Sequence, residues 1–145
     1  DAVLGDLRIW MATRQLTQTI LVVEDDPSIA ELIAWVLDDA GFVVHTAPSV
    51  AEALRLWEQA APDLVVVDFL LPDGLGSDLV RAIRRNKDHD VTPTVVMSAH
   101  PRAREQARAS GADACLQKPF DLDEFFGTVE RLLGRDGAAG RSLHD

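Results

Sequence analysis

Side chains that could perform chemistry stand at the ends of four short, largely apolar runs in this sequence. They are Glu24, Asp25, Asp68, Ser98 and Lys118. Carboxylates that lie within a few ångströms of one another repel, so they either raise a pKa or recruit a cation. With oxygen ligands and few histidines nearby, that cation is expected to be Mg²⁺. A lysine and a serine at the same place add a mobile positive charge and a hydroxyl donor.

Together these side chains are the parts of a phosphoryl-transfer site. Transfer of a phosphoryl group depends mainly on in-line positioning and on neutralisation of charge, and a carboxylate can be the nucleophile. Asp68 has a central place, because it ends the continuous apolar run 64–67, and ligands of open α/β sheets bind beyond the carboxyl ends of the strands. The alternative for Asp68 alone is that it only opens a turn, since Asp is common there.

The elements that must position these residues are five strands alternating with five helices. The strands are expected at 19–23, 42–44, 64–68, 93–98 and 114–117. Asp26–Pro27, Ser49–Glu52 and the acidic run 121–124 are typical of helix starts, and Gly41, Gly111 and Gly134 are typical of helix ends. The first helix is expected to bury Ile29, Ile33, Ala34, Val36 and Leu37, and the fourth to run from about 101 to 110. Such short connections predict an α/β fold, a doubly wound parallel sheet with helices on both faces.

Length and composition fit one globular domain. The chain has 145 residues, of which 47% are hydrophobic and 26% charged, as in ordinary soluble proteins. A net charge of −10 argues against direct binding of nucleic acid. No apolar stretch approaches the roughly 20 residues that span a bilayer, so no membrane contact is expected. The single Cys115 suits a reducing compartment, and the predicted location is cytoplasmic.

The two ends of the chain differ from its middle. Residues 1–17 show no clean hydrophobic period and are interpreted as a tag, a linker or the tail of a preceding segment. Residues 18–134 hold the regular pattern and form the predicted domain. Residues 135–145 are small and polar, and we expect a disordered tail or linker.

Five stretches in order resemble the receiver domain of two-component response regulators. They are ILVVEDD (20–26), DLVVVD (63–68) with Pro72 and Gly76 behind it, VVMSA (95–99), GAD (111–113) and KPF (118–120). The resemblance covers about 115 of the 145 residues. It implies a flavodoxin-like (βα)5 fold with a five-stranded parallel sheet, and a phosphorylatable switch that uses Mg²⁺.

The resemblance also implies a role for each residue of the site. Asp68 would be the phosphoacceptor. Asp25 would contact Mg²⁺ directly and Glu24 through water, and the backbone carbonyl of Leu70 would complete the protein ligands of the metal together with Asp68.

The remaining positions concern the phosphoryl group and the switch. Ser98 would bind a phosphoryl oxygen after transfer, and Lys118 would bridge to the phosphate, with a cis peptide bond before Pro119. The family usually has Tyr or Phe three positions before the lysine, where this chain has Cys115. The usual coupling between the hydroxyl residue and an aromatic side chain is therefore in question.

The expected function is a signalling switch and not a metabolic enzyme. It would accept a phosphoryl group from a histidine kinase or phosphotransfer protein and change its binding to a downstream output domain or protein. Transfer and dephosphorylation would be slow and self-catalysed, and homodimerisation stays open. One alternative is an aspartate-nucleophile phosphatase, although Leu70 holds the place of the second acid and no insertion is long enough for a cap. The other is a pseudo-receiver that binds partners without phosphorylation, against which the complete set of site residues speaks.

Overall fold

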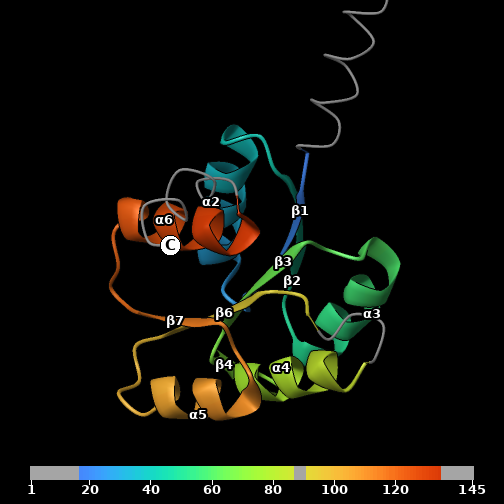
Figure 1. Cartoon of the computed structure of the whole chain (residues 1–145), viewed down its shortest axis with the longest axis vertical. Coiled ribbons are helices and arrows are strands. Elements are labelled where there is room, and N and C mark those ends of the chain that lie inside the picture. Colours follow the sequence, from blue (N-terminus) through green and yellow to red (C-terminus); the bar gives the residue numbers. More distant parts are fainter. Residues whose placement is uncertain (1–16, 87–90, 135–145) are drawn as a thin grey trace, which may run out of the picture.

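The computed structural model describes residues 17–86 and 91–134 of the chain. Five parallel strands form one sheet in the order β2-β1-β3-β6-β7 (Figure 1). The strands are β1 (Thr19–Val23), β2 (Val43–Ala47), β3 (Leu64–Asp68), β6 (Thr94–Ser98) and β7 (Ala114–Gln117). The predicted doubly wound parallel sheet is confirmed.

Helices cover both faces of the sheet. One layer contains α2 (Pro27–Asp39) and α6 (Leu122–Leu133), and the other contains α3 (Val50–Ala60), α4 (Gly76–Arg85) and α5 (Ala103–Ser110) (Figure 1). None of the helices in the described ranges combines the length and the apolar character that crossing a bilayer requires. Two segments were predicted as linkers or tails, 1–17 and 135–145. Except for Thr17, they lie outside the described residues. The domain limits 18 and 134 therefore stay predictions.

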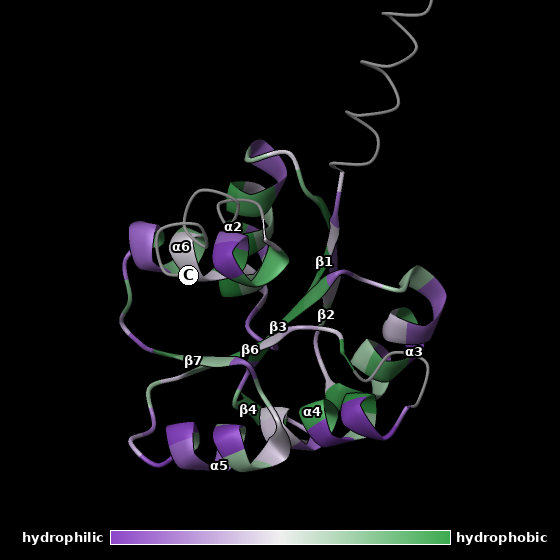
Figure 2. Ribbon diagram, in the orientation of Figure 1, coloured by the Kyte–Doolittle hydropathy of each residue, from purple (hydrophilic) through white to green (hydrophobic). Residues whose placement is uncertain are grey.

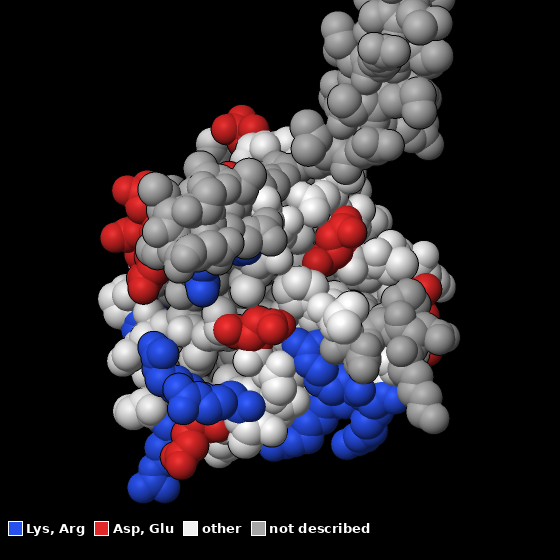
Figure 3. All heavy atoms as spheres, in the orientation of Figure 1, with Lys and Arg blue, Asp and Glu red and all other residues white. Residues whose placement is uncertain are grey.

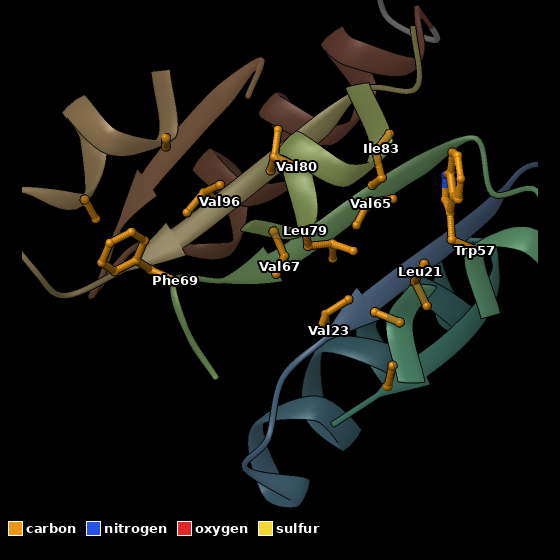
Figure 4. Packing of buried hydrophobic residues seen from close by; sticks show 14 residues of the cluster. Leu21, Val23, Trp57, Val65, Val67, Phe69, Leu79, Val80, Ile83 and Val96 are labelled. Atoms are coloured by element: carbon orange, nitrogen blue, oxygen red, sulfur yellow. The ribbon is translucent and has the colours of Figure 1, made fainter. Parts of the chain in front are cut away.

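Alternate residues of the central strands serve two separate halves of the core. Leu21, Val23, Val65 and Val67 pack with Trp57 of α3 under the layer of α3, α4 and α5 (Figure 4). Their sequence neighbours Ile20, Val22, Leu64 and Val66 face the layer of α2 and α6. Each fully buried Val, Leu or Ile side chain contributes about 1.5–3 kcal/mol relative to exposure. Burial on both faces explains why these strands are apolar without alternation. The helices carry both hydrophilic and hydrophobic residues (Figure 2).

The predicted helix starts are confirmed, with one change at α3. The Asp26 side chain accepts hydrogen bonds from Ser28 N–H at 2.9 Å and Ile29 N–H at 3.4 Å. Ser49 Oγ accepts from Glu52 N–H at 3.2 Å, but the Glu52 carboxylate binds Arg55 and does not complete a capping box. Helix α2 ends as expected, because Gly41 takes a φ of +99° that favours glycine.

The face of α2 that meets the core differs from the predicted one. The apolar pattern predicts Ile29 as a core residue with Val36 and Leu37, but Ile29 is exposed and Ala30 is buried. The prediction for Ile29 is wrong because the helix turns Ala30 inward, which leaves Ile29 and Ile33 lining a groove beside α6.

Two boundaries and one additional element also differ from the sequence-based prediction. Strand β2 extends to Ala47, three residues beyond the apolar run. Helix α5 begins at Ala103, because His100 accepts the N–H groups of Arg102 and Ala103 with its Nδ1 and carbonyl oxygen and so forms a turn first. A small antiparallel hairpin, β4 (Leu70–Leu71) and β5 (Gly74–Leu75), follows β3. Strands of two residues are too short to carry a periodic signal.

Candidate functional site

Three carboxylates meet at the carboxyl ends of β1 and β3. The two strands are neighbours, with Val23 opposite Val67. The next residues, Glu24 after Val23 and Asp68 after Val67, therefore lie side by side. Ligand oxygens of Glu24, Asp25 and Asp68 all fall within 4.8 Å of one another. Glu24 is only 4% exposed, and its burial, followed by the nearby charge of Asp68, raises the pKa of its carboxyl group.

Lys118 reaches this cluster from the end of β7, the edge strand two positions away from β3 in the sheet. Its Nζ donates to Asp68 Oδ1 at 2.9 Å and to Glu24 Oε1 at 3.4 Å. Burial by itself would lower the pKa of Lys118, but the hydrogen bond and charge of Asp68 and the charge of Glu24 outweigh it, so this pKa is raised. Lys118 is therefore a cation at neutral pH and partly offsets the repulsion among the carboxylates.

Ser98 ends the strand next to β3. It is 4% exposed, and its Oγ accepts the His100 N–H at 2.8 Å. Its carbonyl oxygen accepts the Lys118 N–H at 2.8 Å, so the backbones of the two predicted site residues are joined directly. The structure thus places Ser98 at the end of β6 and Lys118 directly after β7, at the same carboxyl ends of the sheet as Asp68.

The loop after Asp68 is held close to the strand end. Phe69 N–H donates to Met97 O at 2.8 Å, and Gly76 N–H donates to Phe69 O at 2.7 Å. A Cβ at Gly76 would lie 2.4 Å from the Asp68 carbonyl oxygen, so only glycine permits this approach. Leu70, in the hairpin, has a side chain that is 57% exposed. A metal-binding role for its carbonyl stays a prediction.

Two expectations concern the fifth strand of the sheet and its exit. The peptide bond between Lys118 and Pro119 is cis, as predicted. Cys115 lies on β7 opposite Val96 and is partly buried. Burial raises the pKa of its thiol, against the opposing charge of Arg104. A small, protonated thiol therefore occupies the position where the resemblance leads us to expect an aromatic side chain.

The chemistry of the donor set fits a hard divalent cation. The cluster offers carboxylate oxygens alone, which Mg²⁺ prefers over nitrogen and sulfur ligands. One lysine does not balance three carboxylates, and the raised pKa of Glu24 reflects burial in an acidic surrounding. A divalent cation would restore that balance.

Asp73 lies in the Pro-Asp-Gly sequence 72–74, between the strands of the hairpin. Its carboxylate accepts Val50 N–H at 2.8 Å and Ala51 N–H at 3.0 Å at the start of α3. These bonds, from Ala51 first and then Val50, lower the pKa of the Asp73 carboxyl. An aspartate in a Pro-Asp-Gly turn is so common that only the fold could reveal its partner.

Comparison with known proteins bears on the family and the fold of this chain. The family model of the response regulator receiver domain matches residues 20–130. An uncharacterized 14.6 kDa protein in the sodA1 3′ region of Leptolyngbya boryana is 35% identical over 77% of this chain and 87% of its own length. The chemotaxis response regulator CheY4 of Vibrio cholerae has a structure with a TM-score of 0.75 at 30% identity, covering 80% of this chain and 98% of CheY4.

Longer relatives match over part of their length. RpaA of Synechocystis sp., named a DNA-binding dual master transcriptional regulator, is 33% identical over 80% of this chain, yet that match is 49% of RpaA. The chain thus spans about half the length of this curated relative. Since the family model matches far more than half of the chain, the chain belongs to the receiver domains of two-component response regulators.

Proposed function

We propose that Asp68 accepts a phosphoryl group from a phosphohistidine of a histidine kinase or phosphotransfer protein. The observation that carries this proposal is the pair of bonds from Lys118 Nζ to Asp68 and Glu24, within a cluster that includes Asp25. A strand-end carboxylate already paired with a cation, beside further acids, has the parts that phosphoryl transfer needs.

The proposed step uses the residues of this chain in defined ways. An Asp68 carboxylate oxygen attacks phosphorus, the phosphorus–nitrogen bond of the donor breaks, and its electron pair stays on the imidazole nitrogen, which takes a proton from solvent. Lys118, a cation at neutral pH, then pairs with a phosphoryl oxygen, and the Ser98 hydroxyl binds another. Slow attack of water on the acyl phosphate returns Asp68 to the free carboxylate.

The proposed Mg²⁺ site consists of Asp25, Asp68 and the Leu70 carbonyl, with Glu24 acting through water. When bound, Mg²⁺ would neutralise charge that develops on the phosphoryl oxygens. Glu24 suits an indirect role because its carboxylate already accepts Lys118 Nζ and, at 3.2 Å, Asp26 N–H.

A groove beside the site fits a helical phosphodonor. It has a volume of about 430 Å³, lies between α2 and α6 and is walled by apolar side chains together with Lys118. Helix α2 contains Glu31, Asp38 and Asp39 but no basic residue. A donor helix with an apolar face flanked by cations would therefore match both the groove and its surroundings, and it would carry its histidine to Asp68.

Output and location are part of the same proposal. Phosphorylation would change contacts with a downstream domain or protein, as the length of relatives such as RpaA suggests. A cytoplasmic location follows from the proposed kinase partnership and from the reduced Cys115. Homodimerisation on phosphorylation is compatible with this scheme.

The two alternatives are less well supported. A phosphatase that uses Asp68 would need a second acid two residues later to protonate its leaving group, and Leu70 has no such group. A pseudo-receiver would not require Asp68, Lys118 and the two other acids to meet, yet they do.

The proposal is tested by treating the protein with acetyl phosphate. We expect one added phosphoryl group by intact-mass spectrometry in the presence of Mg²⁺ and none with a chelator. Asp68→Asn should show no adduct under the same conditions, whereas Asp63→Asn, at the opposite end of β3, should be labelled as the wild type is. Equal labelling of the Asp68 variant and the wild type would refute the assignment.

A further inference from the structure

We infer that Asp73 is a positioning residue for the metal site, because it clamps the loop that carries Leu70 to the start of helix α3. The inference rests on the proposed Mg²⁺ site and adds a residue to it. Asp73 is not a member of the carboxylate cluster. It would act through the backbone that it holds.

The hairpin β4–β5 is anchored to the sheet at its base. The base is held by Phe69 N–H on Met97 O at 2.8 Å and by Gly76 N–H on Phe69 O at 2.7 Å. Leu71 and Leu75 pack partly against the core, whereas the Leu70 side chain is mostly exposed. Burial therefore does little to place Leu70 itself, and backbone contacts must do so.

The tip of the hairpin is anchored by Asp73. Both oxygens of its carboxylate are used, Oδ1 by Val50 N–H at 2.8 Å and Oδ2 by Ala51 N–H at 3.0 Å. A carboxylate at a helix N-terminus interacts favourably with the unpaired N–H groups and with the helix dipole. The arrangement differs from ordinary capping because the acid comes from a loop 22 or 23 residues away in the sequence.

The two hydrogen bonds from Val50 and Ala51 to Asp73, here called the clamp, join the two loops that flank the acidic cluster. On one side, Glu24 N–H donates to Ala47 O at 2.9 Å, and Ala47 ends the strand that leads into α3. On the other side, Leu70 lies between Asp68 and Asp73 in the hairpin. With Asp73 in place, the loops after β2 and β3 are held together around Glu24. A predicted ligand carbonyl on one of these loops is then fixed relative to the carboxylates.

The coupling must act in both directions. If the clamp favours the metal-bound geometry, metal binding must favour the clamp by the same factor. The Val50 and Ala51 amides should therefore exchange with solvent more slowly when Mg²⁺ is bound, although they lie on a helix that contributes no metal ligand.

The test compares four variants by Mg²⁺ titration calorimetry and by amide hydrogen exchange: Asp73→Ala, Asp73→Asn, Asp63→Ala and, as a variant that lacks a proposed ligand, Asp25→Ala. The ionic strength is fixed at about 0.15 M, where exposed charges are screened within about 8 Å. Asp73→Ala removes both hydrogen bonds, and Asp73→Asn removes the same charge but keeps one acceptor oxygen. Asp63→Ala is the matched control, since Asp63 is also an exposed acid, and it accepts Thr19 N–H at 2.8 Å at the far end of the sheet.

We expect Asp73→Ala to weaken Mg²⁺ binding about three- to tenfold, Asp73→Asn to lie between it and the wild type, and Asp63→Ala to stay within twofold of the wild type. Mg²⁺ should protect the Val50 and Ala51 amides in the wild type and not in Asp73→Ala. If Asp73→Ala does not fold, the Mg²⁺ affinity of Asp73→Asn is compared with that of Asp63→Ala instead. Asp73→Asn must then bind Mg²⁺ more weakly than Asp63→Ala.

Failure of the clamp and failure of the site give different results. Wild-type affinity in both Asp73 variants, with Asp25→Ala unable to bind Mg²⁺, would overturn the role of Asp73 and leave the metal site intact. No Mg²⁺ binding by the wild type would overturn both.

Discussion

At the scale of single residues, Lys118 holds the acidic cluster together. Its ammonium group is shared between Asp68 and Glu24, and its raised pKa keeps it charged. A group whose pKa is raised on folding adds stability that is fully present below its unfolded pKa and is lost as pH rises through the folded value. Its contribution is therefore complete at neutral pH and disappears only in alkali.

We expect Lys118→Ala to destabilise the metal-free protein by about 1–3 kcal/mol, because two acids lose a hydrogen-bonded cation. Mg²⁺ should recover much of this loss, since it binds the folded cluster and not the unfolded chain. Thermal unfolding in chelator and in excess Mg²⁺ checks both statements, with Arg131→Ala, an exposed cation on α6, as control. An unchanged melting temperature of Lys118→Ala in chelator would contradict this role.

At the scale of elements, the junction between β3 and α4 depends on Gly76. An added Cβ would meet the Asp68 carbonyl oxygen at 2.4 Å and Phe69 Cα at 3.2 Å, both backbone atoms that cannot rotate away. Gly127 is the natural comparison, because it lies inside α6 with nothing within 4 Å of its added Cβ. The same substitution should therefore have opposite effects at the two positions.

Gly76→Ala should cost about 1–3 kcal/mol through forced backbone shifts, and it should weaken Mg²⁺ binding by moving Asp68. Gly127→Ala should stabilise the helix by about 0.5–1 kcal/mol and leave the metal affinity unchanged. Urea unfolding together with Mg²⁺ titration measures both. Equal effects of the two variants would show that the close approach at Gly76 does not matter.

At the scale of the whole molecule, charge and apolar surface are distributed unevenly. Lys and Arg atoms gather over α4 and α5, at the bottom of the view in Figure 3. The layer of α2 and α6 instead carries the apolar groove next to Lys118, and Leu32 in its wall is 60% exposed. An apolar side chain that is this exposed adds little to folding, so it is available for contact with a partner.

Leu32→Ser should therefore slow phosphoryl transfer from a purified, phosphorylated histidine phosphotransfer domain about tenfold, which corresponds to about 1.4 kcal/mol. Labelling by acetyl phosphate should not change, because a small donor needs no docking surface. Val91→Ser is the control, since Val91 is 84% exposed and does not line the groove. Equal loss with both donors would mean that Leu32 acts on the site itself and not on docking.

The fold class and the residues of the acidic cluster could be predicted from the sequence alone. The runs 20–23 and 64–67 are apolar throughout because both faces of their strands are buried. A continuous apolar run of this kind can be recognised in the sequence. Four residues of the predicted site could be found for the same reason, because each stands at the end of a strand or directly after it: Glu24, Asp68, Ser98 and Lys118. The order of the strands, which brings Glu24 beside Asp68, was decided only by tertiary packing.

Contacts between distant segments were likewise decided by the tertiary structure. Arg84 could be read only as a cation near a helix end, yet it binds Thr92 O, Gly111 O and the Asp113 carboxylate. Asp73 could be read only as a turn residue, yet it caps α3. Hydrogen bonds of this kind depend on where two segments that are distant in the sequence meet in space. Local periodicity and turn preferences carry no information on how close two such segments lie.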